Sequence, residues 1–370
     1  MKKKIYFIAT VYDPIHIFLG PYLNNLYLDY EITIICNLKN NIFKRSKKYK
    51  YCDLNISRNP NIISDLISFF FLFFLFVIRR PYKIISITPK AGFFCTILSR
   101  LLFIDNLHFI TGQVWQNKKN ILSRNFFKII DSLIGNFSNK IIVDSRPQYE
   151  TLRDKNLINK NAIYFNSVSG INFKKFYKNN FFKKNFKLKY KLPKDSFGLI
   201  YVGRINKDKG IYDLIDIYIN LQKILKDNIF LIIVGDDEIN FLKKFSRTFF
   251  KKNKIFYYKK NSNINYYLNL CDLFITCSLR EGFCQSIIEA NSVGLPAIAK
   301  DLHNLSDTII NNKTGYLMKN INLYENQIIS LYFNKNLYKK LSNNCLRRSK
   351  MEFNQNLFLK KFRLFLFNNE

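Results

Sequence analysis

The most regular feature of the chain is an alternation of short apolar runs with longer segments of helical character. The runs are rich in Ile, Val and Phe, and those of the first half lie at residues 5–9, 32–36, 83–87, 107–110 and 140–143. Those of the second half lie at residues 197–202, 229–234, 254–258, 273–276 and 296–299. Continuous apolar runs between helical segments are typical of parallel strands that helices cover on both faces. The pattern therefore predicts an α/β fold with two parallel sheets.

A polar stretch separates the two series of strands. Residues 168–195 are rich in Lys and Asn and lack a clear period, so we expect an interdomain connection there. A chain of 370 residues is long enough for two domains with separate cores. We expect an N-terminal domain over residues 1–167, a C-terminal domain over residues 196–353, and a closing helix over residues 354–370 that packs back on the first domain.

The balance of charge is strongly basic, because 59 Lys and Arg residues face 26 Asp and Glu residues and give a formal charge of +33. Two explanations remain open: attraction to phosphates or acidic lipid headgroups, or a coding bias that raises Lys together with Asn, Ile, Phe and Tyr. The basic residues are scattered, and no aromatic signature of RNA binding accompanies them. We therefore expect an anionic membrane surface rather than nucleic acid as a partner.

The residues that usually build disulfide frameworks and metal sites are few and scattered. The seven cysteines form no C-x-x-C pair, and the three histidines form no H-E-x-x-H motif. Residues 1–4 lead directly into an apolar run, without the pattern of a signal peptide. We expect no metal or other cofactor, and a cytoplasmic location on the inner face of the cell membrane.

The most hydrophobic segment, residues 66–78, ends at Arg79 and Arg80. It is shorter than the roughly 18 apolar residues that span a bilayer. The interpretation that we favour is a helix buried between the sheet and its neighbours. The alternative is a helix that dips into a membrane interface, with both arginines at the level of the headgroups.

The first candidate site follows the strand predicted at residues 197–202. Gly203 allows a tight turn, and Arg204 and Lys209 supply two cations that can neutralise a diphosphate without a metal ion. The alternative is that both are solvated charges of a loop.

The second candidate site follows the strand predicted at residues 273–276. Glu281 and Glu289 stand eight residues apart around a helix start, and Gly282 allows a ligand to approach closely. The amides of Phe283, Cys284 and Gln285 would direct the positive end of a helix dipole at a phosphate or sugar. A carboxylate on an apolar stretch, as at Glu289, needs partners such as ribose hydroxyls. The alternative is structural: Glu281 caps the helix and Glu289 pairs with a basic neighbour.

The acidic turn at residues 236–238 also follows an apolar run. A metal-binding D-x-D motif is one interpretation of it. We favour the other, in which these residues cap the next helix and provide acids for its first turn.

Several motifs together resemble glycosyltransferase family 4, the retaining GT-B transferases. They are the pair Glu281/Glu289 with the Glu-Gly-Phe sequence at residues 281–283, the Gly-Arg and Lys-Gly pairs at residues 203–204 and 209–210, and the segments 294–296 and 314–317. The segments 88–92, 111–115, 143–145 and 169–171 are similar to the subgroup that assembles bacterial capsule, O-antigen and protein-linked glycans. The resemblance implies a GT-B fold, in which two Rossmann-like domains with parallel sheets face one another across a cleft.

The resemblance also implies roles for individual residues. Arg204 and Lys209 would bind the donor diphosphate, Glu289 the ribose, and Glu281 with the following amides the transferred sugar, so the catalytic residues would be Glu281, Arg204 and Lys209. Lys90, Thr111, Gly112 and Gln113 would line the acceptor side. His16 lies after the first strand, close to the expected cleft, and is a further acceptor-side candidate.

The chain departs from the family pattern at three places. Thr111-Gly112 stands where many relatives have His-Gly, residues 10–14 replace a Gly-Gly loop, and Cys284 replaces a small residue or proline.

The activity that the resemblance implies is retaining transfer of a hexose or N-acetylhexosamine from a nucleotide sugar, with UDP as the expected nucleotide, to a lipid-linked saccharide. Two rivals remain: a nucleotide-sugar epimerase of similar shape, and a non-catalytic glycan-binding or scaffold protein.

Overall fold

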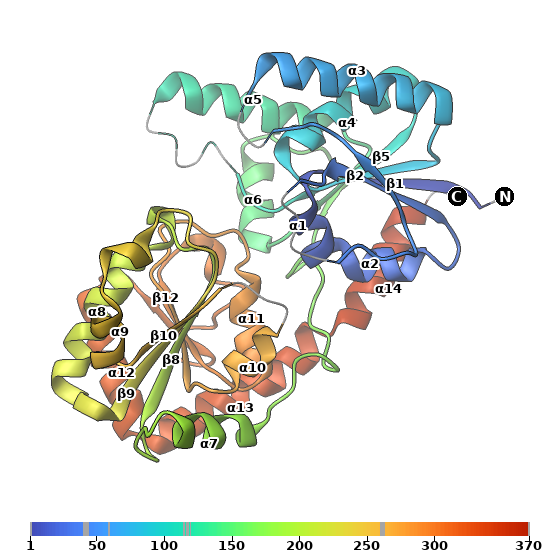
Figure 1. Cartoon of the computed structure of the whole chain (residues 1–370). Coiled ribbons are helices and arrows are strands. Elements are labelled where there is room, and N and C mark those ends of the chain that lie inside the picture. Colours follow the sequence, from blue (N-terminus) through green and yellow to red (C-terminus); the bar gives the residue numbers. More distant parts are fainter. Residues whose placement is uncertain are drawn as a thin grey trace. The chain divides into compact units, whose positions relative to one another are not determined.

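The chain folds as two compact α/β units, each built on a parallel sheet (Figure 1). The computed structural model describes residues 2–39, 44–57, 60–113, 115, 118, 120–259 and 263–368. Unit 1 comprises Met1–Gly170 and Gln355–Glu370, and unit 2 comprises Ile171–Asn354. The prediction of two Rossmann-like domains is confirmed.

Unit 1 contains a seven-stranded sheet in the order β3-β2-β1-β4-β5-β6-β7. Its strands are β1 (Lys4–Val11), β2 (Glu31–Asn37), β3 (Lys50–Asp53), β4 (Lys83–Ser86), β5 (Asp105–Ile110), β6 (Lys140–Val143) and β7 (Ala162–Tyr164). Its helices are α1 (Tyr12–Pro14), η1 (Ile15–Leu19), α2 (Gly20–Leu26), α3 (Ile62–Arg79), α4 (Pro89–Leu102), α5 (Ile121–Phe137), α6 (Arg146–Asp154) and α14 (Gln355–Phe367). Helices α3, α4 and α5 lie on one face of the sheet, and α2 and α14 lie on the other (Figure 1).

Unit 2 contains a six-stranded sheet in the order β10-β9-β8-β11-β12-β13. Its strands are β8 (Phe197–Val202), β9 (Ile229–Val234), β10 (Ile255–Tyr258), β11 (Leu273–Thr276), β12 (Ala297–Lys300) and β13 (Gly315–Met318). Its longer helices are α7 (Asn180–Lys189), α8 (Ile211–Leu225), α11 (Gln285–Ser292), α12 (Asn322–Phe333) and α13 (Lys335–Glu352). Its shorter ones are η3 (Lys207–Lys209), η4 (Lys226–Asn228), η5 (Phe241–Lys244), α9 (Arg247–Lys252), α10 (Ile264–Leu268) and η6 (His303–Leu305).

The predicted strands are all present, with ends within two residues of the expected ones. The strands that the pattern missed are β3, β7 and β13, and each lies at an edge of its sheet. An edge strand pairs on one side and is covered less fully, so it needs no long apolar run. The short, half-exposed sequence of β3 illustrates this.

Helix α3 differs from the buried helix that we favoured. It is longer than the apolar run, extending from Ile62 to Arg79 over 18 residues. Within it only Ser68, Leu72 and Phe76 are buried, and most of its other apolar side chains are exposed. In the described part of the chain it is the one helix long and apolar enough to cross a membrane, by length and composition alone. The prediction of burial is wrong because apolar residues surround this helix on all sides while only one side meets the core.

The segment expected to connect the domains is largely folded. The chain passes from unit 1 to unit 2 at Gly170 and Ile171, and α7 lies inside the expected connection at residues 168–195. Asn179 caps α7 by accepting a hydrogen bond from the amide of Phe181, and Phe186 packs edge-on against Phe256 with the ring centroids 5.0 Å apart. The many lysines around this aromatic anchor hide the helical period from sequence inspection.

The C-terminal helix α14 lies with unit 1, although more than 180 residues of unit 2 precede it. Phe362 is fully buried there, and its ring centroid lies 4.2 Å from that of Tyr22 and 5.9 Å from that of Phe109. The Tyr22 hydroxyl in turn donates to the carbonyl of Val168. Aromatic contacts thus join α2 and α14, which come from opposite ends of the sequence, to β5 of the unit 1 sheet.

We expect Phe362→Ala to destabilise unit 1 by about 3–5 kcal/mol, because it removes a buried aromatic ring and leaves a cavity. Leu364→Ala on the same helix is the matched control, since Leu364 is exposed and should change stability by less than about 1 kcal/mol. Urea unfolding of both variants measures the difference. Equal losses would show that α14 does not depend on this cluster.

Candidate functional site

The candidate site of unit 2 lies where the strand order changes direction. Strands β8 and β11 are neighbours in the sheet, and the chain leaves β8 toward β9 on one side and β11 toward β12 on the other. Ligands of open α/β sheets bind outside the carboxyl ends of the strands at such a point. The first and second candidate sites predicted from sequence directly follow β8 and β11.

Glycines allow the loops at this edge to approach closely. A Cβ atom on Gly235 would lie 1.7 Å from the carbonyl oxygen of Gly203, so the turns after β8 and β9 touch through their backbones. Gly210 has φ of +64°, and a Cβ atom there would lie 2.1 Å from the carbonyl oxygen of Cys277. The short helix η3 is therefore held directly against the segment that follows β11.

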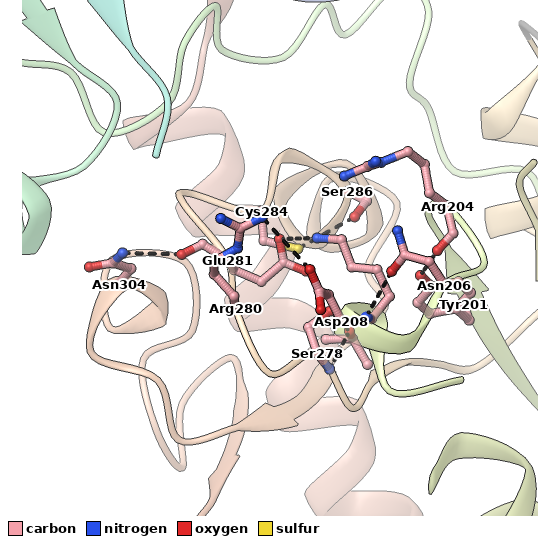
Figure 2. Close-up of polar contacts among 12 residues, drawn as sticks. Tyr201, Arg204, Asn206, Asp208, Ser278, Arg280, Glu281, Cys284, Ser286 and Asn304 are labelled. Carbon is pink, nitrogen blue, oxygen red and sulfur yellow. Dashed lines mark hydrogen bonds and ion pairs between the residues drawn. The ribbon is translucent and has the colours of Figure 1, made fainter. Parts of the chain in front are cut away.

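Lys209 and Glu281 meet across this contact. The Lys209 Nζ lies 2.7 Å from the Glu281 Oε2, and their side chains are only 18% and 10% exposed. The amide of Leu279 donates to the carbonyl of Asp208 at 2.9 Å, which fixes the two backbones beside the ion pair. Figure 2 shows Glu281 together with Asp208 and Arg280 from these two segments. Residues 72 positions apart in the sequence thus form one charged pair.

Arg204 lies on the turn after β8 and is paired differently. Its guanidinium donates to both carboxylate oxygens of Glu238, at 3.1 and 3.2 Å. Asn206 donates to the same carboxylate at 2.8 Å, and the Tyr201 hydroxyl donates to the Arg204 carbonyl at 2.7 Å. The Arg204 side chain is 41% exposed, so solvent or a ligand can reach it (Figure 2).

Helix α11 begins at Gln285 with Cys284 as its N-cap residue. Cys284 adopts the left-handed conformation, with φ of 52°, which is rare for residues other than glycine. Its Sγ lies 3.5 Å from the Ser286 Oγ, and burial raises the pKa of its thiol to about 12. The left-handed Cys284 turns the chain into α11, so the first amides of the helix come a short distance after Glu281 in the chain.

The neighbouring residues divide between the site and the core. Phe283 is buried and packs against Phe353 at a centroid distance of 5.9 Å, so its ring belongs to the core. Gly282 and Gln285 are partly exposed on either side of it. The carbonyl of Glu281 accepts a hydrogen bond of 3.1 Å from Asn304 of η6, a residue that sequence inspection missed.

Glu289 lies one turn inside α11. Burial raises the pKa of its carboxyl group to about 7, and the positive charge of Lys175 opposes this shift. The described part of the chain provides no hydrogen-bond donor to this carboxyl group, and the ion pair with a basic neighbour that the structural alternative requires is not formed there. A hydroxyl-bearing ligand could supply the missing donors.

The acidic turn after β9 contains a helix cap, as we expected. The Asp237 carboxylate accepts hydrogen bonds from the amides of Ile239, Phe241 and Leu242 at 2.9–3.1 Å. Burial would raise the pKa of Asp237, but these backbone hydrogen bonds outweigh it and lower that pKa. Glu238 serves another purpose as the partner of Arg204, which the sequence pattern did not indicate.

The residues expected on the acceptor side all follow strands of the unit 1 sheet. His16 follows β1 on η1, Lys90 follows β4 in the first turn of α4, and Thr111, Gly112 and Gln113 follow β5. Strands β1, β4 and β5 are consecutive in the sheet, so these residues share its carboxyl edge. Val114 of the same motif lies outside the described residues.

The individual environments of these residues differ. His16 is exposed, whereas the Lys90 Nζ is bound to the Asp65 carboxylate at 2.7 Å. Gln113 is buried, and neither atom of its amide group has a hydrogen-bond partner in the described part of the chain. Gly112 has φ of +131°, a value that favours glycine. A ligand or water could satisfy the unpartnered amide of Gln113.

Asp131 on α5 lines a small cavity together with Thr111 and Gly112, and sequence inspection missed it. Burial raises the pKa of its carboxyl group to about 7, and the nearby Trp115 indole opposes the shift. Trp115 packs in the core of this region. His108 is also buried, and burial lowers its pKa to about 3. Trp115 and His108 therefore support the loop from within.

The structure has the GT-B fold, which is found in glycosyltransferases. The structure superposes on HepE of Anabaena in complex with UDP and glucose with a TM-score of 0.81 and 14% identity. The superposition covers 98% of this chain and 99% of HepE. For sucrose-phosphate synthase from Thermosynechococcus elongatus the TM-score is 0.80 with 17% identity, over 99% and 98% of the two chains.

Sequence comparison identifies the family. Residues 182–348, which contain the site of unit 2, match the model of glycosyl transferases group 1. The chain is also 28% identical to the capsular polysaccharide biosynthesis glycosyltransferase CapM of Staphylococcus aureus, over 82% of this chain and 80% of the relative. Unit 2 therefore contains a glycosyl transferases group 1 domain, and the resemblance to family 4 seen in the sequence is confirmed.

The raised pKa of Glu289 predicts a specific dependence of stability on pH. The folded protein keeps this proton up to about pH 7, whereas an unfolded Glu loses it near pH 4.3. Stability should therefore fall as the pH rises between these values, by at most about 3 kcal/mol and by less to the extent that solvent reaches this partly exposed side chain. Glu289→Gln cannot ionise and should lack this fall.

Urea unfolding of wild type and Glu289→Gln at several pH values measures the effect, because all other groups cancel in the difference. Glu352→Gln, which alters an exposed carboxylate of the same unit, is the matched control and should follow the wild type. Parallel curves for all three proteins would contradict the buried state of Glu289.

Proposed function

We propose that the protein transfers a hexose or N-acetylhexosamine from a UDP-sugar to a lipid-linked saccharide, with retention of the anomeric configuration and without a metal ion. The observation that carries the proposal is the ion pair of Lys209 and Glu281 at the switch point of the unit 2 sheet, beside the start of α11. The UDP in the HepE complex and the capsule biosynthesis named for CapM support the choice of donor and pathway class. The reaction would take place on the cytoplasmic face of the membrane.

Donor binding would exchange the partners of the two cations. Without ligand, Lys209 is neutralised by Glu281 and Arg204 by Glu238. A diphosphate carries enough charge to recruit both cations, and Arg204 can bind two phosphate oxygens through its planar guanidinium. Glu281 would then be free to accept hydrogen bonds from hydroxyl groups of the transferred sugar.

The start of α11 and Glu289 would complete the donor site. The amides after Cys284 point their positive dipole end toward a bound anion. Ribose hydroxyls would supply donors to the Glu289 carboxylate. This contact would stabilise its ionised form and lower its pKa on binding.

In the reaction, the bond between the anomeric carbon and the phosphate oxygen breaks and its electron pair moves to the diphosphate. Arg204 and Lys209 stabilise that growing negative charge. The acceptor hydroxyl forms the new bond on the same face of the sugar, and its proton passes to the departing phosphate oxygen. The configuration is therefore retained, and no protein base is needed.

Arg204→Ala and Lys209→Ala should each lower kcat by about 100-fold or more, because each removes a group that stabilises the leaving diphosphate. Each should also reduce the thermal stabilisation that UDP gives to the wild type. The matched control is Lys207→Ala, an exposed cation on the same η3 segment, which should retain activity. Wild-type activity in both site variants would eliminate the mechanism.

A screen of nucleotide sugars for thermal stabilisation should identify the donor, because a ligand of the folded state raises its stability. The stabilising sugar should persist when incubated with enzyme alone and be consumed when a lipid-linked saccharide is added, at a rate unchanged by EDTA. Isomerisation of the donor alone would indicate an epimerase. Binding without any turnover would indicate a glycan-binding or scaffold protein, and loss of activity in EDTA would contradict metal independence.

A further inference from the structure

Helix α3 carries a continuous apolar face that the protein leaves open to solvent. Its exposed side chains recur every three or four residues and so share one side of the helix; they are Ile62, Ile63, Leu66, Ile67, Phe70, Phe71, Phe74, Val77 and Ile78. Isolated exposed apolar residues are ordinary, but a contiguous patch of this extent marks an interaction surface.

Helix α5 carries a second apolar stripe on the same layer of unit 1. Its exposed members are Ile121, Leu122, Phe126, Ile129, Leu133 and Phe137. Helix α4 lies between α3 and α5 and contacts both (Figure 1). Leu101 and Phe103, at the end of α4, are exposed as well. The three helices thus form one layer, here called the α3–α5 face, with large apolar side chains along both outer helices.

The charges of this layer favour an anionic partner. The only acidic residue of α3 is Asp65, which is neutralised by Lys90, and the only one of α5 is Asp131, which lines the cavity near Thr111. The basic residues Arg79, Arg80, Arg100 and Arg124 are exposed. Exposed apolar residues bordered by arginines are the combination that binds the interface of an anionic bilayer.

The opposite side of α3 restricts how such a surface can bind. Leu72 and Phe76 are completely buried in the core of unit 1, and the Phe76 ring lies 6.1 Å from that of Tyr6 on β1. Phe69 packs against Phe94 of α4 at 5.7 Å. To cross a bilayer, α3 would have to leave this core. Bound in place, it can only lie parallel to the membrane surface.

We infer that the α3–α5 face docks the protein on an anionic membrane, with α3 and α5 lying in the plane of the headgroups and neither crossing the bilayer. The inference rests on the proposed function in one respect: a lipid-linked acceptor would be reached at the membrane on which this face docks. The partner that we infer for the α3–α5 face is a lipid surface. A second copy of the chain is the competing partner that the experiment must exclude.

Flotation with vesicles tests the docking face. Wild-type protein should bind vesicles that contain phosphatidylglycerol more tightly than vesicles of phosphatidylcholine, and added salt should weaken the binding. Phe70→Glu with Phe74→Glu, and separately Phe126→Glu with Ile129→Glu, should each weaken binding at least about tenfold by removing inserted apolar area. Phe333→Glu in unit 2 changes an equally exposed aromatic residue and should bind as the wild type does.

The orientation is tested by tryptophan placed at Ile63, Phe70 or Val77 and quenched by lipids brominated at different depths. All three positions should report the same shallow depth. A deep Phe70 position between two shallow ends would show a spanning helix and overturn the inference.

The outcomes separate docking from catalysis. The glutamate variants should keep the thermal stabilisation by UDP and the transfer to a soluble acceptor analogue, because they lie outside the donor site. Loss of vesicle binding in Phe333→Glu as well, or no binding of the wild type, would overturn the docking face. So would a wild-type dimer that the same substitutions dissociate. Vesicle binding without transfer from any UDP-sugar would instead contradict the proposed function alone.

Discussion

The site of unit 2 depends on a contact between two backbones. Gly210 lies so close to the carbonyl of Cys277 that no side chain fits between them, and Leu279 donates to Asp208 beside it. This contact joins the segment after β8 to the segment after β11 at the point where the strand order diverges. The ion pair of Lys209 and Glu281 follows from it, since both side chains project from segments that are already fixed. Charge alone would not hold such a pair, because two partly buried ions must recover the hydration that they lose.

Each cation of the site has an acidic partner within the protein. Glu281 neutralises Lys209 and Glu238 neutralises Arg204, so the unliganded site does not expose two adjacent unbalanced charges. The arrangement preorganises the cations near the position where a diphosphate would lie, at the cost of breaking two ion pairs on binding. Arg204, which is more exposed, loses less in that exchange than Lys209. Glu289 differs from Glu281 and Glu238, because burial raises the pKa of its carboxyl group to about 7 and no basic side chain is paired with it in the described part of the chain.

Much of this architecture could be predicted from the sequence, and the failures have physical causes. Central strands such as β8 and β9 are covered on both faces and therefore show as uninterrupted apolar runs. The edge strand β3 has no buried residue, and α7 buries only Phe186 and carries four lysines, so neither shows as an apolar run. In the site, motif spacing placed Lys209 and Glu281 at one sheet edge. Glu238 and Asn304 come from other loops, and only the tertiary fold brings them to Arg204 and to the Glu281 carbonyl.

The misjudged burial of α3 exposes a limit of pattern analysis that bears on function. A helix apolar on all sides is expected to be buried on all sides, either in a core or in lipid. In α3 the inner side packs through Leu72 and Phe76 in the core of unit 1, and the outer side is exposed. The sequence cannot distinguish these sides because both are aromatic and aliphatic. The fold distinguishes them, and the outer side is the one that the inferred membrane docking would cover. Under the proposed function the two surfaces would have different roles: the α3–α5 face would hold the protein where an insoluble acceptor is found, and the cationic site of unit 2 would bind a soluble, highly charged donor. Both surfaces are compatible with one basic chain, because the phosphate groups of lipids and of nucleotides attract the same kinds of side chain, Lys and Arg.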